Sequence, residues 1–297
     1  MNRREFLARA AASAAVPRIA AAQSPWGGPV LDIHVHPRQV PGQELDHLDG
    51  SGVAKGVILA HAAQDDRAKA AVAKHPDRFV WFTNPDVGKP DIGDLLRAAL
   101  KSGAIGTGEL QNRVLLDGPE MRRVYEVAAE FNAPVLLHFQ DGASNSGFIR
   151  LPAILKEYSK TVFIGHATSW WAHISAEVDD KVSYPSGRVK PGGLTDRMLA
   201  EYPNLYGDLS ANSGRNALGR DPDFAAAFLV RHQNKLMFGS DCGCRDGKGT
   251  GQGSQEPLIK GKCVARETLT ALKQLTSPQL FRAITWDNGV KLLKITA

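Results

Sequence analysis

The stretch LDIHVHPR, residues 31–38, sets two histidines two residues apart at the end of an apolar, β-branched run. Side chains at positions i and i+2 of a strand lie on the same face, so we expect His34 and His36 to point together. An isolated pair of this kind is as consistent with two hydrogen-bonded polar residues at a strand end as with two metal ligands. The choice between these interpretations depends on the rest of the chain.

The 297-residue chain continues with apolar runs that alternate with helical patterns. We predict strands over 30–34, 56–60, 79–82, 104–109, 134–139, 161–166, 204–210 and 235–241. Helical patterns cover 65–74, 92–101, 120–131, 151–158, 194–201 and 223–232, whereas 44–50 is short and poorly periodic. Such alternation indicates parallel strands with right-handed crossovers. Eight units of this kind predict an α/β protein with a TIM-type (β/α)8 barrel.

A doubly wound open sheet is the alternative α/β architecture. Its glycine-rich dinucleotide turn has no counterpart here, because Gly103 and Gly106 lie inside a predicted strand and do not open a helix. The long connections 169–191 and 246–262 both follow predicted strands. In a barrel such loops build the active-site face.

Residues 1–22, MNRREFLARAAASAAVPRIAAA, form a predicted signal peptide, and 23–297 a single barrel domain. The segment has a charged start, an alanine-rich apolar run and three alanines at its end. Residues 2–7, NRREFL, resemble a twin-arginine export signal, with an ordinary amphipathic helix as the alternative. We therefore expect export to the periplasm by the twin-arginine machinery. The apolar run is shorter than the roughly 20 residues that a membrane-spanning helix needs.

The positive charge of the chain is concentrated in this leader. The whole chain has a formal charge of +5, and residues 1–22 contain four arginines and one glutamate, so about +2 is left for the remainder. A nearly neutral body argues against nucleic acid as a partner, because phosphate backbones favour basic surfaces. We expect a small-molecule substrate and leave the oligomeric state open, a homo-oligomer included.

The three cysteines, Cys242, Cys244 and Cys263, match no zinc-finger spacing. In an oxidising compartment Cys263 could form a disulfide with either of the others, whereas the two-residue spacing disfavours a bond between Cys242 and Cys244. For at least one of the three we expect an unpaired, buried thiol.

Side chains suited to metal binding or proton transfer recur where the predicted strands end. In the order of strands 1, 4, 5, 6 and 8 they are His34 and His36, Glu109, His138, His166 and Asp241. The carboxyl ends of barrel strands meet at one face, so these imidazoles and carboxylates can converge on a divalent ion. Each residue alone has an ordinary structural explanation, but their recurrence favours a metal site.

These motifs resemble those of the amidohydrolase superfamily, nearest to its amidohydrolase-related (family 2) metal-dependent hydrolases. The resemblance covers nearly the whole mature chain, from DIHVHP (32–37) through GHA (165–167) and FGSD (238–241) to ITWDNGVKLLKI (284–295). The last stretch departs mildly from the family pattern, with Asp287-Asn288-Gly289 where an Asn-Pro-Ala type of segment is usual. The motif set is specific for the superfamily and says little about the substrate.

The resemblance implies that His34 and His36 hold a first metal together with Asp241, and that His138 and His166 hold a second. The metals would activate a water. Asp241 would take its proton and later pass it to the leaving group, as a general base and then acid.

Glu109 is the candidate bridge between the two ions, as in the superfamily's metal-dependent DNase branch, because no lysine lies on predicted strand 4. If Glu109 is not a ligand, the site would hold one metal. His138 would then join the first ion, and His166 would be free as an acid or base. We favour two ions, zinc or else manganese.

The resemblance predicts a metal-dependent hydrolase acting on an ester, lactone, amide or similar bond of a small molecule. The alternatives are a metal-dependent non-oxidative decarboxylase and a catalytically inactive barrel that only binds. Arg113 or Arg215 could hold a substrate carboxylate or phosphate. Trp170 is a third candidate contact, because one of the adjacent tryptophans 170 and 171 is expected to face outward.

Overall fold

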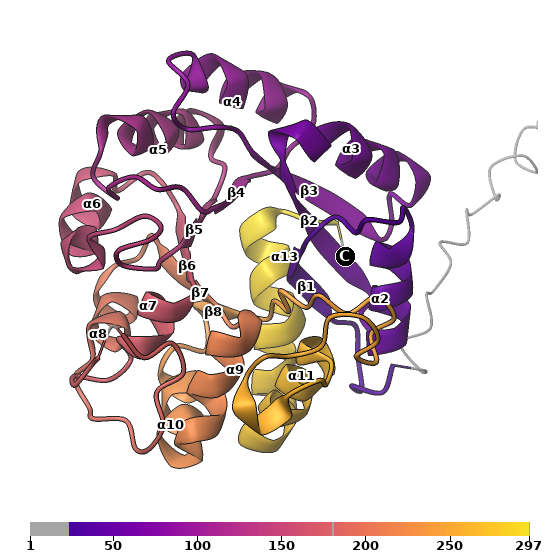
Figure 1. Cartoon of the computed structure of the whole chain (residues 1–297), viewed down its shortest axis with the longest axis vertical. Helices are drawn as coiled ribbons and strands as arrows, with labels where there is room; N and C mark the ends of the chain where they lie inside the picture. Colours follow the sequence, from indigo (N-terminus) through magenta and orange to yellow (C-terminus); the bar gives the residue numbers. More distant parts are fainter. Residues whose placement is uncertain (1–23, 180, 297) are drawn as a thin grey trace, which may run out of the picture.

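The computed structural model describes residues 24–179 and 181–296 and contains one sheet of eight parallel strands. The strands are β1 (Leu31–Val35), β2 (Lys55–His61), β3 (Phe79–Asn84), β4 (Thr107–Leu110), β5 (Val135–His138), β6 (Phe163–His166), β7 (Leu205–Asp208) and β8 (Leu236–Met237). They pair in chain order from β1 to β8, and helices surround them (Figure 1). The predicted TIM-type barrel is therefore confirmed. The predicted signal peptide, residues 1–22, lies outside the described residues.

At least one helix follows each strand. The α-helices are α2 (Gln43–Ser51), α3 (Asp65–Lys74), α4 (Ile92–Lys101), α5 (Pro119–Phe131), α6 (Leu151–Glu157), α7 (Thr168–Ala172), α8 (Leu194–Glu201), α9 (Ala211–Arg220), α10 (Pro222–Arg231), α11 (Val264–Leu275), α12 (Pro278–Arg282) and α13 (Asn288–Leu293). Short 3-10 turns occupy η2 (Ala62–Gln64), η3 (Phe148–Arg150) and η4 (Pro257–Ile259), and η5 (Ala283–Asp287) is a π-helix. None of the described helices is both long enough and apolar enough to cross a membrane.

The seam of the barrel lies between the first and last strands. The backbone N–H of Ile33 donates to the carbonyl of Phe238 (3.1 Å), and the N–H of Asp241 donates to the carbonyl of His34 (3.0 Å). These two bonds bring the ends of β1 and β8 together, so that residues far apart in the sequence share one rim of the barrel.

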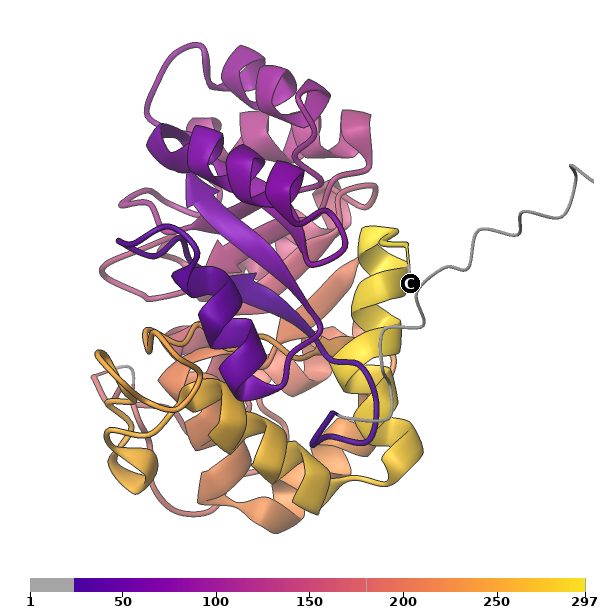
Figure 2. The ribbon, with the colours of Figure 1, turned by 90° about the vertical axis from the view of Figure 1, so that its right-hand side faces the viewer.

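A cluster of apolar side chains fills the barrel interior. Its buried members are Leu31, Ile33, Val57, Leu59, Phe82, Leu136, Ile164, Met237, Trp286 and Leu293. The last two come from η5 and α13, and α13 contacts both β1 and β8. In Figure 2, α13 lies on one side of the molecule and the long loop after β8 on the opposite side. The C-terminal helix thus closes one end of the barrel, and the other end is left to the strand-end side chains.

The structure differs from the sequence prediction at a few elements. The poorly periodic segment 44–50 is part of a helix, α2, which buries only a few of its side chains, including His47 and Leu48. The last strand is much shorter than predicted and ends at Met237, because the chain turns into the loop that carries Asp241.

Candidate metal centre

An irregularity in β1 turns both histidines of the opening motif toward the barrel mouth. Ile33 packs inside the barrel, whereas Val35 belongs to the outer core. The pairing register with β2 shifts between Asp32 and Val35. Simple alternation would put His34 on the outer face, and the shift allows it to face inward. The imidazoles of His34 and His36 accordingly lie together, with their Nε2 atoms 3.2 Å apart.

Glu109 lies between two pairs of histidines. Its Oε2 atom is 3.1 Å from Nε2 of His36 and 3.5 Å from Nε2 of His34. Its Oε1 atom is 3.0 Å from Nε2 of His166 and also contacts Nδ1 of His138. The register of β4 with β5 shifts between Thr107 and Leu110, next to this residue. Each carboxylate oxygen thus faces one histidine pair.

Asp241 approaches the same histidines from the loop after β8. Its Oδ1 atom lies 3.4 Å from Nε2 of His36, and its Oδ2 atom lies 3.9 Å from Nε2 of His166. The residue has a left-handed backbone, with φ 45°, which is a strained conformation for a non-glycine residue. Its side chain is 28% exposed, against 7% for Glu109. Asp241 is therefore the acid of the cluster that a substrate can reach.

The outer nitrogens of three histidines are held by acceptors. Nδ1 of His34 donates to the carboxylate of Asp208 (2.7 Å), and Nδ1 of His36 lies 3.2 Å from the carbonyl of Leu59. Ser210 donates its hydroxyl to Asp208 (2.6 Å), so its oxygen accepts from Nδ1 of His166 (2.7 Å). A nitrogen that donates carries the proton, so in the neutral imidazole Nε2 keeps a lone pair. All three lone pairs face the cluster.

This arrangement requires positive charge at its centre. Lone pairs on buried nitrogens face carboxylate oxygens, and Nε2 of His166 is buried without a hydrogen-bond partner among the described residues. Burial alone would lower the pKa of His34, but Asp241 and Asp208 raise it well above its usual value. Burial likewise opposes the rise for His36, yet Asp241 and Glu109 raise its pKa to about 9. The negative electrostatic potential that favours protonated histidines here also favours a divalent cation.

The acids of the cluster are held in their charged form. Burial would raise the pKa of Glu109, but the neighbouring His166 and His138 hold it well below the usual range. For Asp241, burial is likewise outweighed by His34 and His36, and the pKa is lowered. Three overlapping groups of ligand atoms result, each within 4.8 Å: His34, His36 and Glu109; Glu109, His138 and His166; His34, His166 and Asp241. Such nitrogen and oxygen donors fit zinc or manganese.

A cleft of about 650 Å³ opens beside Asp241 and His36. Its other lining residues are Pro37, Arg38, Gln39, Val40, Gln43, Asn212, Cys242, Gly243, Arg245, Gly251 and Gln252. Arg38 is largely buried and donates from Nη2 to the carbonyl of Cys242, while its Nε atom is buried without a described partner. The cleft is therefore lined by the carboxylate-bearing Asp241 and by two arginines, Arg38 and Arg245.

The predicted substrate contacts lie elsewhere in the structure. Trp170 has no exposed surface and packs against Phe139 and Phe148, and Trp171 is only 3% exposed. The expectation that one of the two tryptophans faces outward is therefore wrong, because α7 folds both into the core. Arg113 is exposed in the segment after β4.

Arg215 lies on α9, with two buried side-chain nitrogens that lack described partners. Arg113, Trp170 and Arg215 are not among the residues that line the cleft beside Asp241.

Sequence reasoning missed Asp208 and Ser210 as orienting residues, and Arg38 and Arg245 as lining residues. Asp208 ends β7 and obeys the same strand-end rule as the other site residues. The predicted strand 204–210 extends two residues beyond it, so the sequence pattern does not mark Asp208 as a strand end. Arg38 stands two residues after His36, and that proximity was the available signal.

No family model matches this chain, and no curated protein sequence matches it. Solved structures do match. A probable 2-pyrone-4,6-dicarboxylic acid hydrolase from Acinetobacter baumannii, with citric acid bound, superposes with a TM-score of 0.61 at 17% identity, covering 90% of this chain and 99% of that one.

Two decarboxylases are also similar. The 2,6-dihydroxybenzoate decarboxylase from Rhizobium has a TM-score of 0.52 at 13% identity, over 90% of this chain and 98% of that one. A 5-carboxyvanillate decarboxylase variant from Novosphingobium aromaticivorans, with manganese and 3-methoxy-4-hydroxy-5-nitrobenzoic acid bound, has a TM-score of 0.55 at 15% identity, over 85% and 80% of the two chains. Likeness at these identities shows the shared barrel fold.

Proposed function

We propose that this chain is a metal-dependent hydrolase of the amidohydrolase superfamily. The observation that carries the proposal is the placement of Glu109, whose two carboxylate oxygens face different histidine pairs at 3.0–3.5 Å. His34, His36 and Asp241 would hold one divalent ion, His138 and His166 a second, and Glu109 would bridge them. Ions held there supply Lewis-acid charge, which makes water nucleophilic near neutral pH and polarises a substrate bond.

The chain's own residues supply the proton transfer. Asp241 is charged at neutral pH, because its pKa is lowered against the effect of burial by His34 and His36. It borders the cleft and can accept a proton from the attacking water and return it to the leaving group. His166 has no exposed surface, and Ser210 holds its Nδ1. This supports a ligand role for His166 over one as the free acid or base.

The substrate class follows from the charge of the cleft. Arg38 and Arg245 line it together with Asp241, and guanidinium groups bind carboxylates with two parallel hydrogen bonds. The similar solved structures hold citric acid or a substituted benzoic acid. Together these support a small carboxylated ester, lactone or amide as the substrate. Arg113 and Arg215 would contact the parts of larger substrates that extend beyond the cleft.

Metal removal combined with a substrate screen tests the function. Purified protein is assayed on carboxylated lactones, esters and amides and on phosphoesters, before and after chelation, and again after addition of zinc or manganese. We expect hydrolysis that disappears on chelation and returns with the metal. Asp241→Asn should lower kcat by about 10²–10⁴-fold, the range for loss of a general acid–base group. Full activity of the metal-free protein would disprove the metal claim.

Decarboxylation is the second candidate, because two of the similar structures are decarboxylases. The group His34, His166 and Asp241 could hold a single ion for that reaction. Product analysis in ¹⁸O-water separates the two. Hydrolysis places the label in the product, whereas decarboxylation releases carbon dioxide. If Asp241→Asn leaves the biological effect of the protein intact and no turnover is found, the barrel is an inactive binding module.

We also propose that the mature enzyme acts in the periplasm after twin-arginine export. The support is the sequence of residues 1–22, with paired arginines at 3 and 4. Replacing both arginines by lysine should leave the full-length precursor in the cytoplasm, as measured by cell fractionation. Unchanged periplasmic protein would contradict the proposal.

A further inference from the structure

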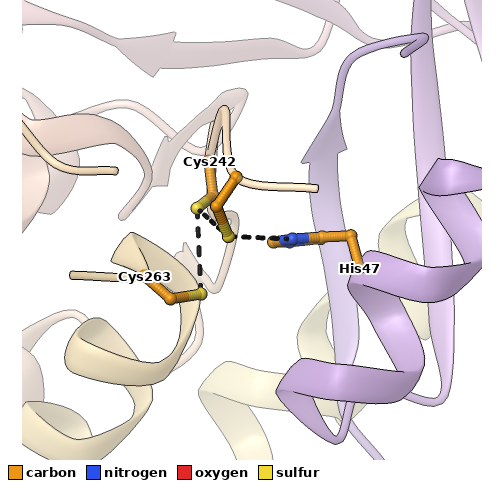
Figure 3. A group of neighbouring side chains, drawn as sticks. His47, Cys242 and Cys263 are labelled. Atoms are coloured by element: carbon orange, nitrogen blue, oxygen red, sulfur yellow. Dashed lines mark hydrogen bonds between the residues drawn. The ribbon is translucent and has the colours of Figure 1, made fainter. Parts of the chain in front are cut away.

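A second cluster of metal-ligand side chains lies apart from the centre described above. His47, Cys242, Cys244 and Cys263 each offer one ligand atom, and these four atoms all lie within 4.8 Å of one another (Figure 3). Each residue has at most 3% of its surface exposed. We propose that these four residues form a structural zinc site with three thiolates and one imidazole. The proposal does not depend on the catalytic function proposed above.

The distances match those of a tetrahedral zinc site. Zn–S bonds of about 2.3 Å and Zn–N bonds of about 2.0–2.1 Å give roughly 3.8 Å between two sulfurs and roughly 3.6 Å between sulfur and nitrogen. The Cys242 and Cys263 sulfurs are 3.8 Å apart, those of Cys242 and Cys244 are 3.2 Å apart, and Cys244 Sγ is 3.5 Å from Nδ1 of His47. Small adjustments would bring all four donors around one ion.

The imidazole of His47 is poorly satisfied as an ordinary core residue. Its Nδ1 atom lies 3.5 Å from the sulfur of Cys244, which is a weak hydrogen-bond partner, and its Nε2 atom is buried without a described partner. A buried polar ring without good partners costs free energy. Coordination of Nδ1 to zinc removes that cost. Asp32 Oδ2 is also buried without a described hydrogen-bond partner, and Asp32 interacts electrostatically with His47.

The ligands come from three segments that meet at the seam of the barrel. His47 lies on α2 after the first strand, Cys242 and Cys244 lie in the loop after β8, and Cys263 is the N-terminal cap of α11. Four protein ligands complete the coordination of a tetrahedral ion and leave no position for a substrate, which is typical of a structural site. Zinc here would cross-link the first and last units of the barrel. It would also hold Cys242 in place, and hence the adjacent Asp241 of the metal centre.

A disulfide is the competing use of these thiols. It would join two of the three cysteines and leave the third thiol and His47 without a function. The sulfurs of the three free cysteines in the structure all point into one group with the imidazole, as Figure 3 shows for the labelled residues. A shared ion uses all four donors, so we favour zinc.

The test separates this site from the catalytic one by removing the latter. The double variant His34→Asn/His166→Asn removes at least one ligand from each of the three ligand groups of the catalytic centre. Produced in zinc-supplemented cells, it should still contain about one zinc per chain by elemental analysis. Adding Cys263→Ser should reduce that zinc at least tenfold. Adding Ala265→Ser in its place, a buried substitution on the same helix that leaves all four ligands, should not reduce it.

A spectroscopic measurement keeps the proposal testable if the cysteine variant does not fold. X-ray absorption at the zinc edge of the double variant should show sulfur neighbours at about 2.3 Å, and its cobalt-substituted form should show thiolate-to-cobalt charge-transfer bands. Three outcomes overturn the proposal: a zinc shell without sulfur, a mass lower by two hydrogens without sulfur-bound zinc, or three free thiols in zinc-free protein purified without chelator.

Discussion

The carboxylate of Asp208 lies 2.7 Å from Nδ1 of His34, and both side chains are fully buried. The same carboxylate oxygen accepts a hydrogen bond from Ser210, whose hydroxyl oxygen accepts from His166. One acid on β7 therefore orients an imidazole on β1 and, through a hydroxyl, an imidazole on β6. It keeps the Nε2 lone pair of each ring directed toward the candidate metals.

Asp208→Asn should lower metal affinity by about 10–100-fold, the usual cost of losing an outer-shell partner of a ligating histidine. The amide can no longer act as a charged acceptor for both His34 and Ser210. Affinity is measured by competition with a chromogenic chelator, and circular dichroism checks the fold. An affinity equal to that of the unmodified protein would show that Asp208 serves packing only.

Gly165→Ala should destabilise the fold by about 1–3 kcal/mol through overpacking. A Cβ at this β6 position would lie 2.4 Å from the ring of Trp170, which is stacked on Phe139 and cannot easily move. Urea unfolding measures the change. Gly28→Ala is the matched control, because its Cβ would meet nothing within 4 Å, and we expect a change within about 0.5 kcal/mol.

Urea unfolding and KM of a second variant at this position test whether Trp170 is a packing residue or a substrate contact. Trp170→Phe combined with Gly165→Ala should recover part of the lost stability, because the smaller ring makes room for the added methyl group. It should leave KM unchanged. A raised KM with unchanged stability would restore the sequence-based prediction that Trp170 contacts the substrate.

The barrel and six residues of its centre could be predicted from the sequence for one physical reason. Parallel strands with apolar interiors leave a local signal, and their carboxyl ends must meet at one rim. His34 and Glu109 stand at such ends, so their convergence follows from the fold class. Their inward orientation was less predictable, because register shifts in β1 and β4 accompany it, and these depend on pairing between strands.

Other features have no local signal. His47 is separated from Cys244 by nearly 200 residues, and no short spacing links them. Their meeting depends on closure of the barrel seam, which only the complete fold provides. Whether Trp171 faces solvent depends likewise on its packing with Trp170 and Phe228, and adjacency in the sequence does not reveal it.

Acid should weaken the partly buried interaction of Asp196 with His232 and Arg231 on the outer helices. Burial opposes the shift, but hydrogen bonds from His232 and Arg231 lower the pKa of Asp196 below its usual 3.8. The pairing therefore stabilises the fold above that value and is lost as the pH falls through the lower folded-state pKa. Asp196→Asn should cost about 1–2 kcal/mol near pH 7, and the difference should shrink toward pH 2.

Asp223→Asn is the control for this pH dependence. Asp223 is 90% exposed and pairs with Arg188, and exposed pairs contribute about 0–1 kcal/mol. Urea unfolding of both variants at neutral and acidic pH gives the comparison. A cost for Asp196→Asn that is the same at both pH values would mean that its charge does not contribute.

Glu109→Gln distinguishes a bridged pair of ions from a single ion. The two carboxylate oxygens of Glu109 face His36 and His166, one in each histidine pair. The amide of the variant retains one acceptor oxygen but loses the negative charge. If Glu109 bridges, the variant should lose at least one of two bound ions and bind the remaining one more than about 100-fold more weakly, beyond the effect of an outer-shell change. Metal content is measured with the cysteine cluster intact, and its sulfur-bound zinc is counted separately by X-ray absorption. One nitrogen- and oxygen-bound ion per chain, held equally tightly in the variant and the unmodified protein, would make Glu109 a bystander and leave a mononuclear centre, for which His34, His166 and Asp241 form a ligand group.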